Sequence, residues 1–160
     1  MTLPSIGTHA PGFTLPNQDG TLIKLADLLG QFVVIYFYPK ALTSGCTVQA
    51  CAIRDNWEQL QRSGTHVIGI SPDSPKLLKK FKDTENLPFD LLSDSEHKVA
   101  EAYGTWQQKS MYGRTYMGMA RDTFILDQKG TIISVLRKVS PATHIHDVMT
   151  VISQHIATNK

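Results

Sequence analysis

The two cysteines of this 160-residue chain, Cys46 and Cys51, are its clearest candidates for chemistry. Cys46 follows an apolar run that stops at Pro39 and a short loop of small and hydroxyl residues, and it opens a helical pattern. At a helix N-terminus, unpaired backbone N–H groups and the positive end of the helix dipole stabilise a thiolate. A buried, inert thiol is the other common fate of a free cysteine. Position alone leaves both interpretations of Cys46 open.

The spacing of the two cysteines restricts how they can react with each other. Residues five apart on a helix are separated by about 7.5 Å of rise and roughly 140° of rotation. Their Cα atoms then lie about 8 to 9 Å apart, beyond the ~7 Å limit for a disulfide without backbone movement. Either the cysteines never pair, or the first turns of their helix unwind when they do. The spacing also differs from the C-x-x-C unit of zinc sites and thioredoxin-type motifs.

Strands alternating with helices are predicted to position these cysteines. The run 32–38 has no polar alternation, which is typical of a strand buried on both faces, and Pro39 ends it. A single helix over about 45–62 follows and ends at Gly64. Alternating steps of four and three place on one face of this helix Cys46, Ala50, Ile53, Trp57 and Leu60. Cys46 is therefore expected at the inward-facing start of the helix.

The remaining patterns complete one α/β domain over residues 1–160. Turn signals predict hairpins at both ends, and a Ser-Pro pair at 74–75 predicts a helix start. The stretch 104–120 has no convincing period and is predicted to be irregular. The result is a mixed central β-sheet flanked by helices, with an N-terminal β-hairpin. Its other expected elements are a hairpin over 13–25, a helical turn at 27–30, strands at 66–71 and 89–92, helices at 74–83, 96–103 and 142–156, and a hairpin over 123–136.

Composition and charge exclude several classes of function. Hydrophobic residues make up 41% and charged residues 19%, as in an ordinary globular protein. A formal net charge of +2 and the lack of a basic stripe argue against nucleic acid as a partner. The longest apolar run is far shorter than the ~20 residues that span a bilayer, and the first residues do not resemble a secretion signal. We therefore expect a cytoplasmic protein, where a cysteine pair is more often catalytic or metal-binding than structural.

One stretch of the chain closely resembles a known active-site signature. The segment Tyr-Phe-Tyr-Pro-Lys-x-x-Thr-x-Gly-Cys-Thr-Val-Gln-Ala-Cys resembles that of the peroxiredoxins, and more narrowly the bacterioferritin comigratory protein or peroxiredoxin Q branch. The resemblance extends over nearly the whole chain. It is carried by the signature at 36–51, Gly-Ile-Ser at 69–71, Leu-Leu-Ser-Asp at 91–94, Tyr-Gly-x-Trp at 103–106, Ser-Met-Tyr-Gly at 110–113 and Arg-x-Thr-Phe-Ile-Leu-Asp at 121–127.

The resemblance implies a thioredoxin-like fold and a thiol-dependent peroxidase without a cofactor or metal. Cys46 would reduce hydrogen peroxide or an organic hydroperoxide and become a sulfenic acid. Cys51 would condense with it to an intramolecular disulfide, which thioredoxin or a similar dithiol would reduce. Pro39 would shield the site, Thr43 would hydrogen-bond the thiolate and the peroxide, and Arg121 would supply positive charge. The branch also implies a monomer. The stretch 104–120 is then either an apolar wall for larger hydroperoxides or a packed loop.

Two other functions would use the same cysteines. A redox sensor would oxidise Cys46 and change a partner surface, without turnover. A copper-type metallochaperone on a related fold would need a third ligand, for which His144 and His146 are the candidates. On a helix, residues two apart face about 200° from each other, so these two histidines cannot serve one site together.

Overall fold

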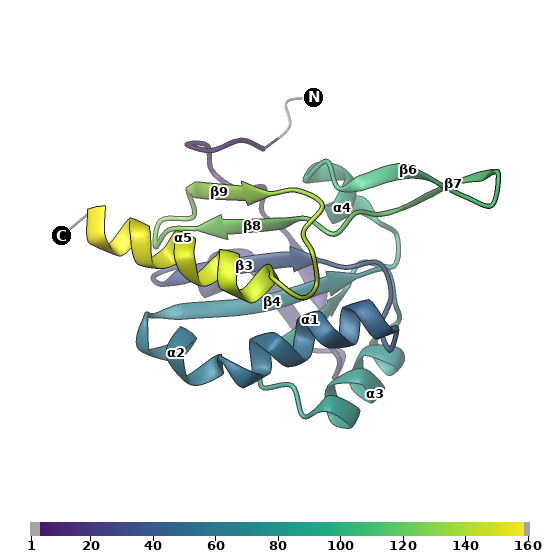
Figure 1. Ribbon diagram of the computed structural model, residues 1–160, viewed down its shortest axis with the longest axis horizontal. Coiled ribbons are helices and arrows are strands. Elements are labelled where there is room, and N and C mark those ends of the chain that lie inside the picture. Colours follow the sequence, from purple (N-terminus) through teal and green to yellow (C-terminus); the bar gives the residue numbers. More distant parts are fainter. Residues whose placement is uncertain (1–3, 159–160) are drawn as a thin grey trace.

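The computed structural model describes residues 4–158, and a five-stranded sheet lies at its centre (Figure 1). The central strand β3 pairs in parallel with β4 and antiparallel with β8, so the predicted mixed sheet is confirmed. In sheet order the strands are β5 (Asp90–Ser93), β4 (Thr65–Ser71), β3 (Phe32–Phe37), β8 (Thr123–Leu126) and β9 (Ile132–Leu136).

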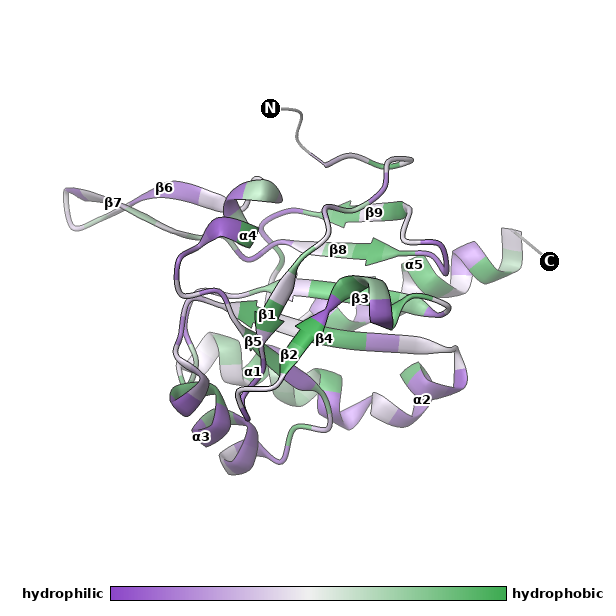
Figure 2. Cartoon of the chain, turned by 180° about the vertical axis from the view of Figure 1, so that it is seen from behind, coloured by the Kyte–Doolittle hydropathy of each residue, from purple (hydrophilic) through white to green (hydrophobic). Residues whose placement is uncertain are grey.

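Strand β3 is buried along its whole length, as its apolar run predicts. Tyr36 of β3 lies opposite Gly69 of β4 and Thr123 of β8. A Cβ atom on Gly69 would approach the Tyr36 ring to 2.8 Å, so only glycine fits at this point of the neighbouring strand. Figure 2 shows the strands of the central sheet as predominantly hydrophobic. Because both faces of the sheet are covered, β3 is a rigid base for the loop that follows it.

The two faces of the sheet are covered unequally. Cys46, Ala50 and Ile53 of α1 belong to the larger apolar core, together with residues of α2, α3 and α5. The opposite core contains Ala100 of α4 and the N-terminal elements β1, β2 and η1. The bounds of these elements are α1 (Ser44–Asp55), α2 (Trp57–Arg62), α3 (Pro75–Glu85), α4 (Lys98–Ala102), α5 (His144–Thr158), β1 (Thr14–Pro16), β2 (Leu22–Lys24) and the 3-10 helix η1 (Leu25–Leu28).

The prediction of one continuous helix over 45–62 is wrong, because the helix breaks at Asn56. The Asn56 side-chain amide donates to the Ala52 carbonyl at 2.8 Å, the acceptor that its own backbone N–H would use in a helix. That N–H turns to the Ile53 carbonyl instead, at 3.1 Å. The apolar face nevertheless continues across the break, since Leu60 of α2 is buried like Ile53 of α1.

The prediction that 104–120 is irregular is also wrong. Strands β6 (Trp106–Met111) and β7 (Arg114–Met119) form a separate antiparallel hairpin that projects from the body of the molecule (Figure 1). Its turn is Tyr112-Gly113, with φ values of 53° and 77°, as in the tight turns favoured between antiparallel strands. The alternation of apolar and polar residues is missing because most of the hairpin is exposed and has no face against the core.

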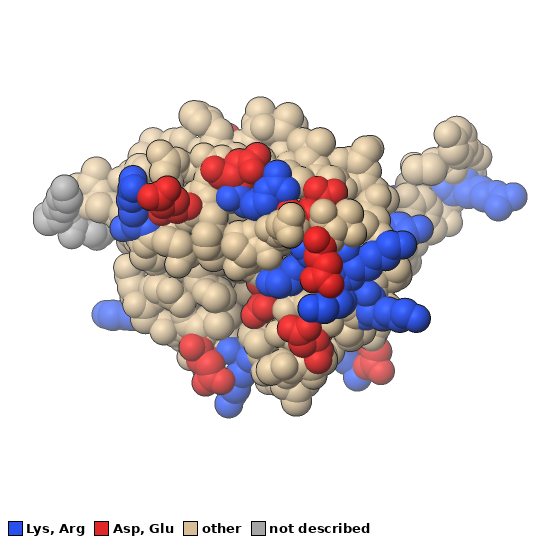
Figure 3. All heavy atoms as spheres, turned by 90° about the horizontal axis from the view of Figure 1, so that it is seen from below, with Lys and Arg blue, Asp and Glu red and all other residues tan. Residues whose placement is uncertain are grey.

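Helix α3 begins where the Ser-Pro pair predicts, with the Ser74 hydroxyl accepting from the Leu77 N–H at 3.3 Å. Lys76, Lys79 and Lys80 lie on a solvated face, where Lys79 pairs with Asp19 at 3.3 Å and with Asp83 at 3.5 Å. Lys82 is half-buried and donates to the Phe89 carbonyl at 2.8 Å. Figure 3 shows acidic and basic side chains interspersed on the face of the molecule seen from below. Among residues 4–158, no helix is long and apolar enough to cross a membrane.

Candidate active site

Cys46 is the third residue of α1 and is only 1% exposed. Thr43 precedes the helix as its N-cap residue, but its side chain makes no capping hydrogen bond. The same position in α3 is filled by Ser74, which does cap its helix. The Thr43 side chain therefore leaves the first-turn amides of α1 uncapped, and Cys46 lies in that turn. Such free N–H groups are the donors that stabilise an anion at a helix N-terminus.

Arg121 brings a positive charge to the same sulfur from 75 residues further along the chain. Its Nη1 atom donates to Cys46 Sγ at 3.4 Å and to the Gln49 side-chain oxygen at 2.7 Å. Gln49 is fully buried one helical turn after Cys46. A Cβ on Gly45 would lie 3.3 Å from Arg121 Nη2, closer than ordinary contact, so glycine leaves room for the guanidinium. The fold thus brings Arg121, which the resemblance implies as a source of positive charge, into contact with Cys46.

Asp122 anchors the backbone that carries Arg121. The Asp122 carboxylate is buried and accepts from Thr105 Oγ1 and from Arg137 Nη1, both at 2.8 Å. The backbone N–H of Lys138 donates to its other oxygen at 3.0 Å. These bonds join the base of the β6–β7 hairpin to the segment after β9, and Arg121 lies between them. The Arg121 side chain therefore extends from a backbone segment that these hydrogen bonds hold in place.

Pro39 and Thr43 lie at the two ends of the loop between β3 and α1. Pro39 is half-buried two residues after β3, at the place where its type predicts the strand to stop. Thr43 is exposed, and its hydroxyl donates to the Lys40 carbonyl at 2.8 Å. In this state the Thr43 proton is therefore directed at the loop backbone, while the lone pairs of its oxygen remain open to a further donor.

Cys51 lies on the same intact helix, and both cysteines are free thiols. The half-buried Cys51 thiol donates to the Glu85 carboxylate, with Sγ and Oε2 3.3 Å apart. Burial first, and then this hydrogen bond, raise the pKa of the Cys51 thiol above its ordinary value. The structure therefore holds the unpaired state of the two cysteines, with Cys51 facing α3.

The two histidines considered as candidate metal ligands, both in the first turn of α5, have different surroundings. His144 is buried, with Nε2 2.7 Å from Thr123 Oγ1, whereas His146 is exposed. Within residues 4–158, no cluster of three or more His, Cys, Asp or Glu side chains is placed to hold a metal ion. Among the described residues, the side chains brought together at α1 are two thiols and a guanidinium.

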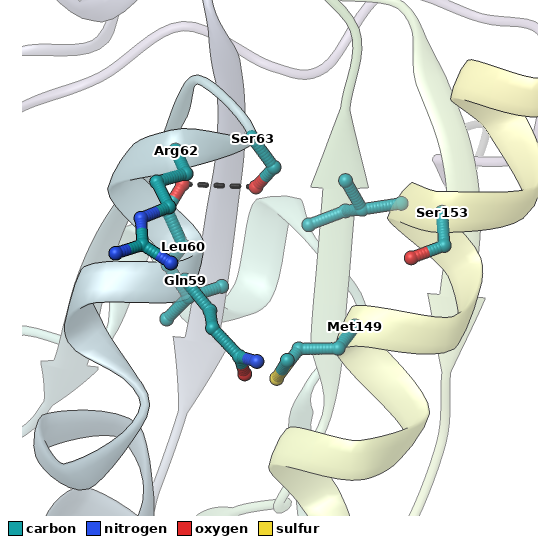
Figure 4. A pocket seen from close by; sticks show the side chains of 7 residues that line it. Gln59, Leu60, Arg62, Ser63, Met149 and Ser153 are labelled. Atoms are coloured by element: carbon teal, nitrogen blue, oxygen red, sulfur yellow. Dashed lines mark hydrogen bonds between the residues drawn. The ribbon is translucent and has the colours of Figure 1, made fainter.

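A hollow of about 380 Å³ between α2 and α5 offers a contrast to the cysteine site (Figure 4). It is lined by the apolar side chains of Leu60, Met149 and Ile152 and by four polar residues, Gln59, Arg62, Ser63 and Ser153. The Ser63 hydroxyl there already donates to the Leu60 carbonyl at 2.9 Å. No cysteine, histidine or carboxylate lines this hollow. The chemistry of the described residues is concentrated instead at the start of α1.

Three residues of the site were not predicted from the sequence as contributors. Gln49 stands three positions after Cys46, and this helical spacing is a signal that could have placed it beside Arg121. Asp122 adjoins Arg121, but its partners Thr105 and Arg137 come from other elements. Glu85 reaches Cys51 only through the packing of α3 beside α1, and no local pattern indicates that contact.

Comparison with known proteins agrees with this geometry. The AhpC/TSA family pattern matches residues 6–135. Peroxiredoxin Bcp of Escherichia coli (strain K12) is 48% identical over 143 residues, 89% of this chain and 91% of the relative. Peroxiredoxin Bcp of Bacillus subtilis (strain 168) is 44% identical over 149 residues, 93% of this chain and 94% of the relative.

The solved structures that resemble this chain are peroxiredoxins as well. The bacterioferritin comigratory protein of Xanthomonas campestris superposes with a TM-score of 0.85 at 31% identity, covering 89% of this chain and 91% of the other. A peroxiredoxin Q of Xylella fastidiosa superposes with a TM-score of 0.89 at 26% identity, over 100% of both chains. This chain therefore belongs to the AhpC/TSA family, in its Bcp and peroxiredoxin Q branch, and is a peroxidase with a thioredoxin-like fold.

Proposed function

We propose that Cys46 is the residue that attacks the peroxide. The supporting observation is the 3.4 Å contact between Arg121 Nη1 and Cys46 Sγ at an uncapped helix N-terminus. The Cys46 thiolate attacks one peroxide oxygen, the O–O bond breaks, and the departing oxygen takes a proton to become water or an alcohol. The sulfur is left as a sulfenic acid. Negative charge spreads over the sulfur and both oxygens in this step, which the guanidinium and the amides can stabilise.

Thr43 and Pro39 complete this proposal. With its own proton on the Lys40 carbonyl, the Thr43 oxygen is free to accept a hydrogen bond from the O–H of a bound peroxide. That bond would orient the peroxide towards Cys46. Pro39 closes the other end of the loop with a ring that offers no backbone N–H, and it would limit the access of water to the sulfur.

Cys51 is proposed as the resolving thiol. It attacks the sulfenic sulfur of Cys46, an S–S bond forms, and the sulfenic oxygen leaves as water. Five residues of intact helix hold the two Cα atoms beyond disulfide range, so α1 has to unwind locally for this step. The spacing favours an intramolecular disulfide that exists only in a partly unfolded form of the helix.

Thioredoxin or a similar dithiol protein is the proposed reductant, and hydroperoxides are the proposed substrates. The X. campestris relative has alkyl peroxide reduction activity. We extend that activity to this chain and include hydrogen peroxide. The protein is proposed to work as a monomer in the cytoplasm. Steady peroxide consumption with thioredoxin, thioredoxin reductase and NADPH tests the reductant, and a protein that stays oxidised in this mixture would exclude it.

Two serine variants test the assignment of the cysteines. Cys46→Ser should abolish peroxide reduction, whereas Cys51→Ser should complete one turnover and stop at the sulfenic acid. Dimedone, which reacts with sulfenic acids, should label Cys51→Ser after one equivalent of peroxide and leave Cys46→Ser unlabelled. Labelling of Cys46→Ser would show that the roles are reversed.

A further inference from the structure

The Cys51 thiol is held by a second helix. Its Sγ lies 3.3 Å from the Glu85 carboxylate at the C-terminal end of α3. Arg54 joins the same two helices, because its Nη1 donates to the Glu85 carbonyl at 2.6 Å and lies 3.8 Å from the Glu85 carboxylate. Two residues of α1, Cys51 and Arg54, therefore contact α3, and both of them bind Glu85.

The chemistry of this contact favours the protonated form of Cys51. A carboxylate accepts a hydrogen bond from a neutral thiol but repels a thiolate. Three other groups interact electrostatically with the Cys51 sulfur. Arg54 favours the thiolate, and the Asp55 carboxylate disfavours it. A thiolate at Cys51 would in turn raise the pKa of the Tyr36 phenol. Of the four groups, only Glu85 forms a hydrogen bond with the sulfur. Its contact is therefore specific to the thiol and to the folded helix.

We propose that Glu85 is a positioning residue for the resolving step, which holds Cys51 as a docked, protonated thiol while α1 is folded and releases it when α1 unwinds. This inference rests on the proposed role of Cys51. It means that the contact stabilises the folded helix, in which Cys51 is held away from Cys46. Removal of Glu85 should therefore accelerate disulfide formation.

The released thiol completes a balanced reaction. Away from Glu85, the Cys51 thiol loses its proton to solvent more readily and attacks the Cys46 sulfenic sulfur as a thiolate. The S–O bond breaks, and the departing hydroxide takes up a proton to become water. The Cys51 sulfur is oxidised and the Cys46 sulfur is reduced, so the pair shares one disulfide and no further oxidant is needed.

The contact has a defined pH dependence. The pKa of Cys51 is raised in the folded helix, so its contribution to the folded state is complete below the ordinary thiol pKa of about 8.5. That contribution is lost as the pH rises through the raised value. The acceleration caused by removal of Glu85 should therefore be largest near neutral pH and should shrink above pH ~8.5.

Rapid-quench mass spectrometry of Glu85→Gln tests the proposal. The fully reduced protein is mixed with one equivalent of hydrogen peroxide, and the sulfenic acid and the disulfide are followed as separate masses. At pH 7 we expect disulfide formation to be about five- to tenfold faster than in the wild type, because a neutral amide oxygen accepts from the thiol more weakly than a carboxylate and no longer repels a thiolate. The rate of sulfenic acid formation should not change. Asp83→Asn, which removes an exposed charge two residues earlier on α3, should match the wild type.

A second measurement reads the Cys51 thiol directly. In a Cys46→Ser background, the pH profile of iodoacetamide alkylation reports the pKa of Cys51, and Glu85→Gln should move it to lower pH. An unchanged rate of disulfide formation would overturn the proposal, and so would an unchanged alkylation profile. If Glu85→Gln does not fold cooperatively, Glu85→Asp takes its place and should shift both readouts in the same direction.

The same data separate this inference from the proposed function. If the wild type consumes peroxide without forming a Cys46–Cys51 disulfide, the role of Cys51 as the resolving thiol fails. If the disulfide forms equally fast with and without the Glu85 carboxylate, only the role of Glu85 fails.

Discussion

One guanidinium nitrogen of Arg121 serves two acceptors that lie one helical turn apart. Its bond to the Gln49 oxygen is 2.7 Å long, whereas its contact with the Cys46 sulfur is 3.4 Å. In the proposed cycle the sulfur changes its charge and its substituent, but the amide oxygen of Gln49 does not. Gln49 is therefore the constant partner that can keep the guanidinium aimed at the sulfur between steps.

Replacement of Gln49 by leucine should slow the first chemical step. Gln49→Leu keeps the volume of a fully buried side chain but removes the acceptor that fixes Arg121. Loss of a hydrogen bond to a charged group predicts a rate constant for the reaction of Cys46 with peroxide that is about tenfold lower. Stopped-flow measurement under single-turnover conditions gives this constant. Gln59→Leu, at an exposed position of α2, is the control, and equal rates in both variants would exclude a role for Gln49.

Thr43 is expected to need its hydroxyl but not its methyl group. Thr43→Val removes both the bond to the Lys40 carbonyl and the lone pairs proposed to accept from the peroxide. We predict a fall of about tenfold or more in the second-order rate constant for peroxide, while Thr43→Ser should stay close to the wild type. A competition assay against a second peroxidase compares the three proteins. Equal loss in Thr43→Ser would indicate that the methyl group packs the loop instead.

Helix α1 has two structural requirements that conflict. In the proposed mechanism its folded N-terminus stabilises the attacking sulfur, yet the same residues separate Cys46 from Cys51. The break at Asn56 lies beyond both cysteines, so α2 has its own hydrogen bonds and need not follow when α1 opens. Unwinding can therefore be confined to a segment between the β3 loop and Asn56.

Hydrogen exchange should detect this local opening. In the oxidised protein we predict that amides of residues 46–51 lose protection, while those of β3 and of α2 keep it. Mass-resolved exchange of reduced and oxidised samples makes the comparison, and oxidised Cys51→Ser serves as the control without a disulfide. Full protection of 46–51 in the disulfide form would contradict the requirement for unwinding.

The elements that could be predicted from the sequence are those with a buried face. The runs that form β3 and β4 are recognisable because burial on both sides selects apolar residues, over the whole of β3 and over the middle of β4. The β6–β7 hairpin has little buried surface, and its Tyr112-Gly113 turn is a weaker signal than Asn-Gly. The end of α1 was missed for a different reason. An apolar face with helical spacing continues through Asn56 and conceals the change of hydrogen-bond partner there.

The site around Cys46 joins segments that are far apart in the sequence, and no local sequence pattern connects them. The motif around Cys46 indicated Cys51, Thr43 and Pro39, and the resemblance to the peroxiredoxins supplied Arg121. The anchoring of Arg121 by Asp122 and the docking of Cys51 on Glu85 depend on side chains brought together by the sheet order and by helix packing. Such contacts are tertiary, so they could be found only in the folded chain.

Helix α5 closes the molecule over the same face that carries α1. His144, its first residue, is 1% exposed and hydrogen-bonded to Thr123 of β8, and its ring lies 5.6 Å from that of Tyr36 in β3. Burial, and secondarily the charge of Arg121, lower the pKa of His144 to about 4. The unfolded chain has an ordinary histidine pKa of about 6.5. Protons therefore bind the unfolded state first, and stability is lost as the pH falls below about 6.5, until the folded state also binds a proton near pH 4.

This linkage predicts that the fold loses stability in acid and that His144 is one source of the loss; burial also lowers the pKa of His66, which acts in the same direction. Between pH 7 and pH 5, His144 should account for about 2 kcal/mol of lost unfolding free energy. His144→Gln keeps a polar side chain beside Thr123 but cannot take up the proton, so its stability should fall by about that much less over the same interval. Urea unfolding at both pH values measures the difference. His146→Gln, at an exposed position two residues further on, should follow the wild type. Parallel losses in all three proteins would mean that other groups, and not the buried end of α5, set the acid limit of the fold.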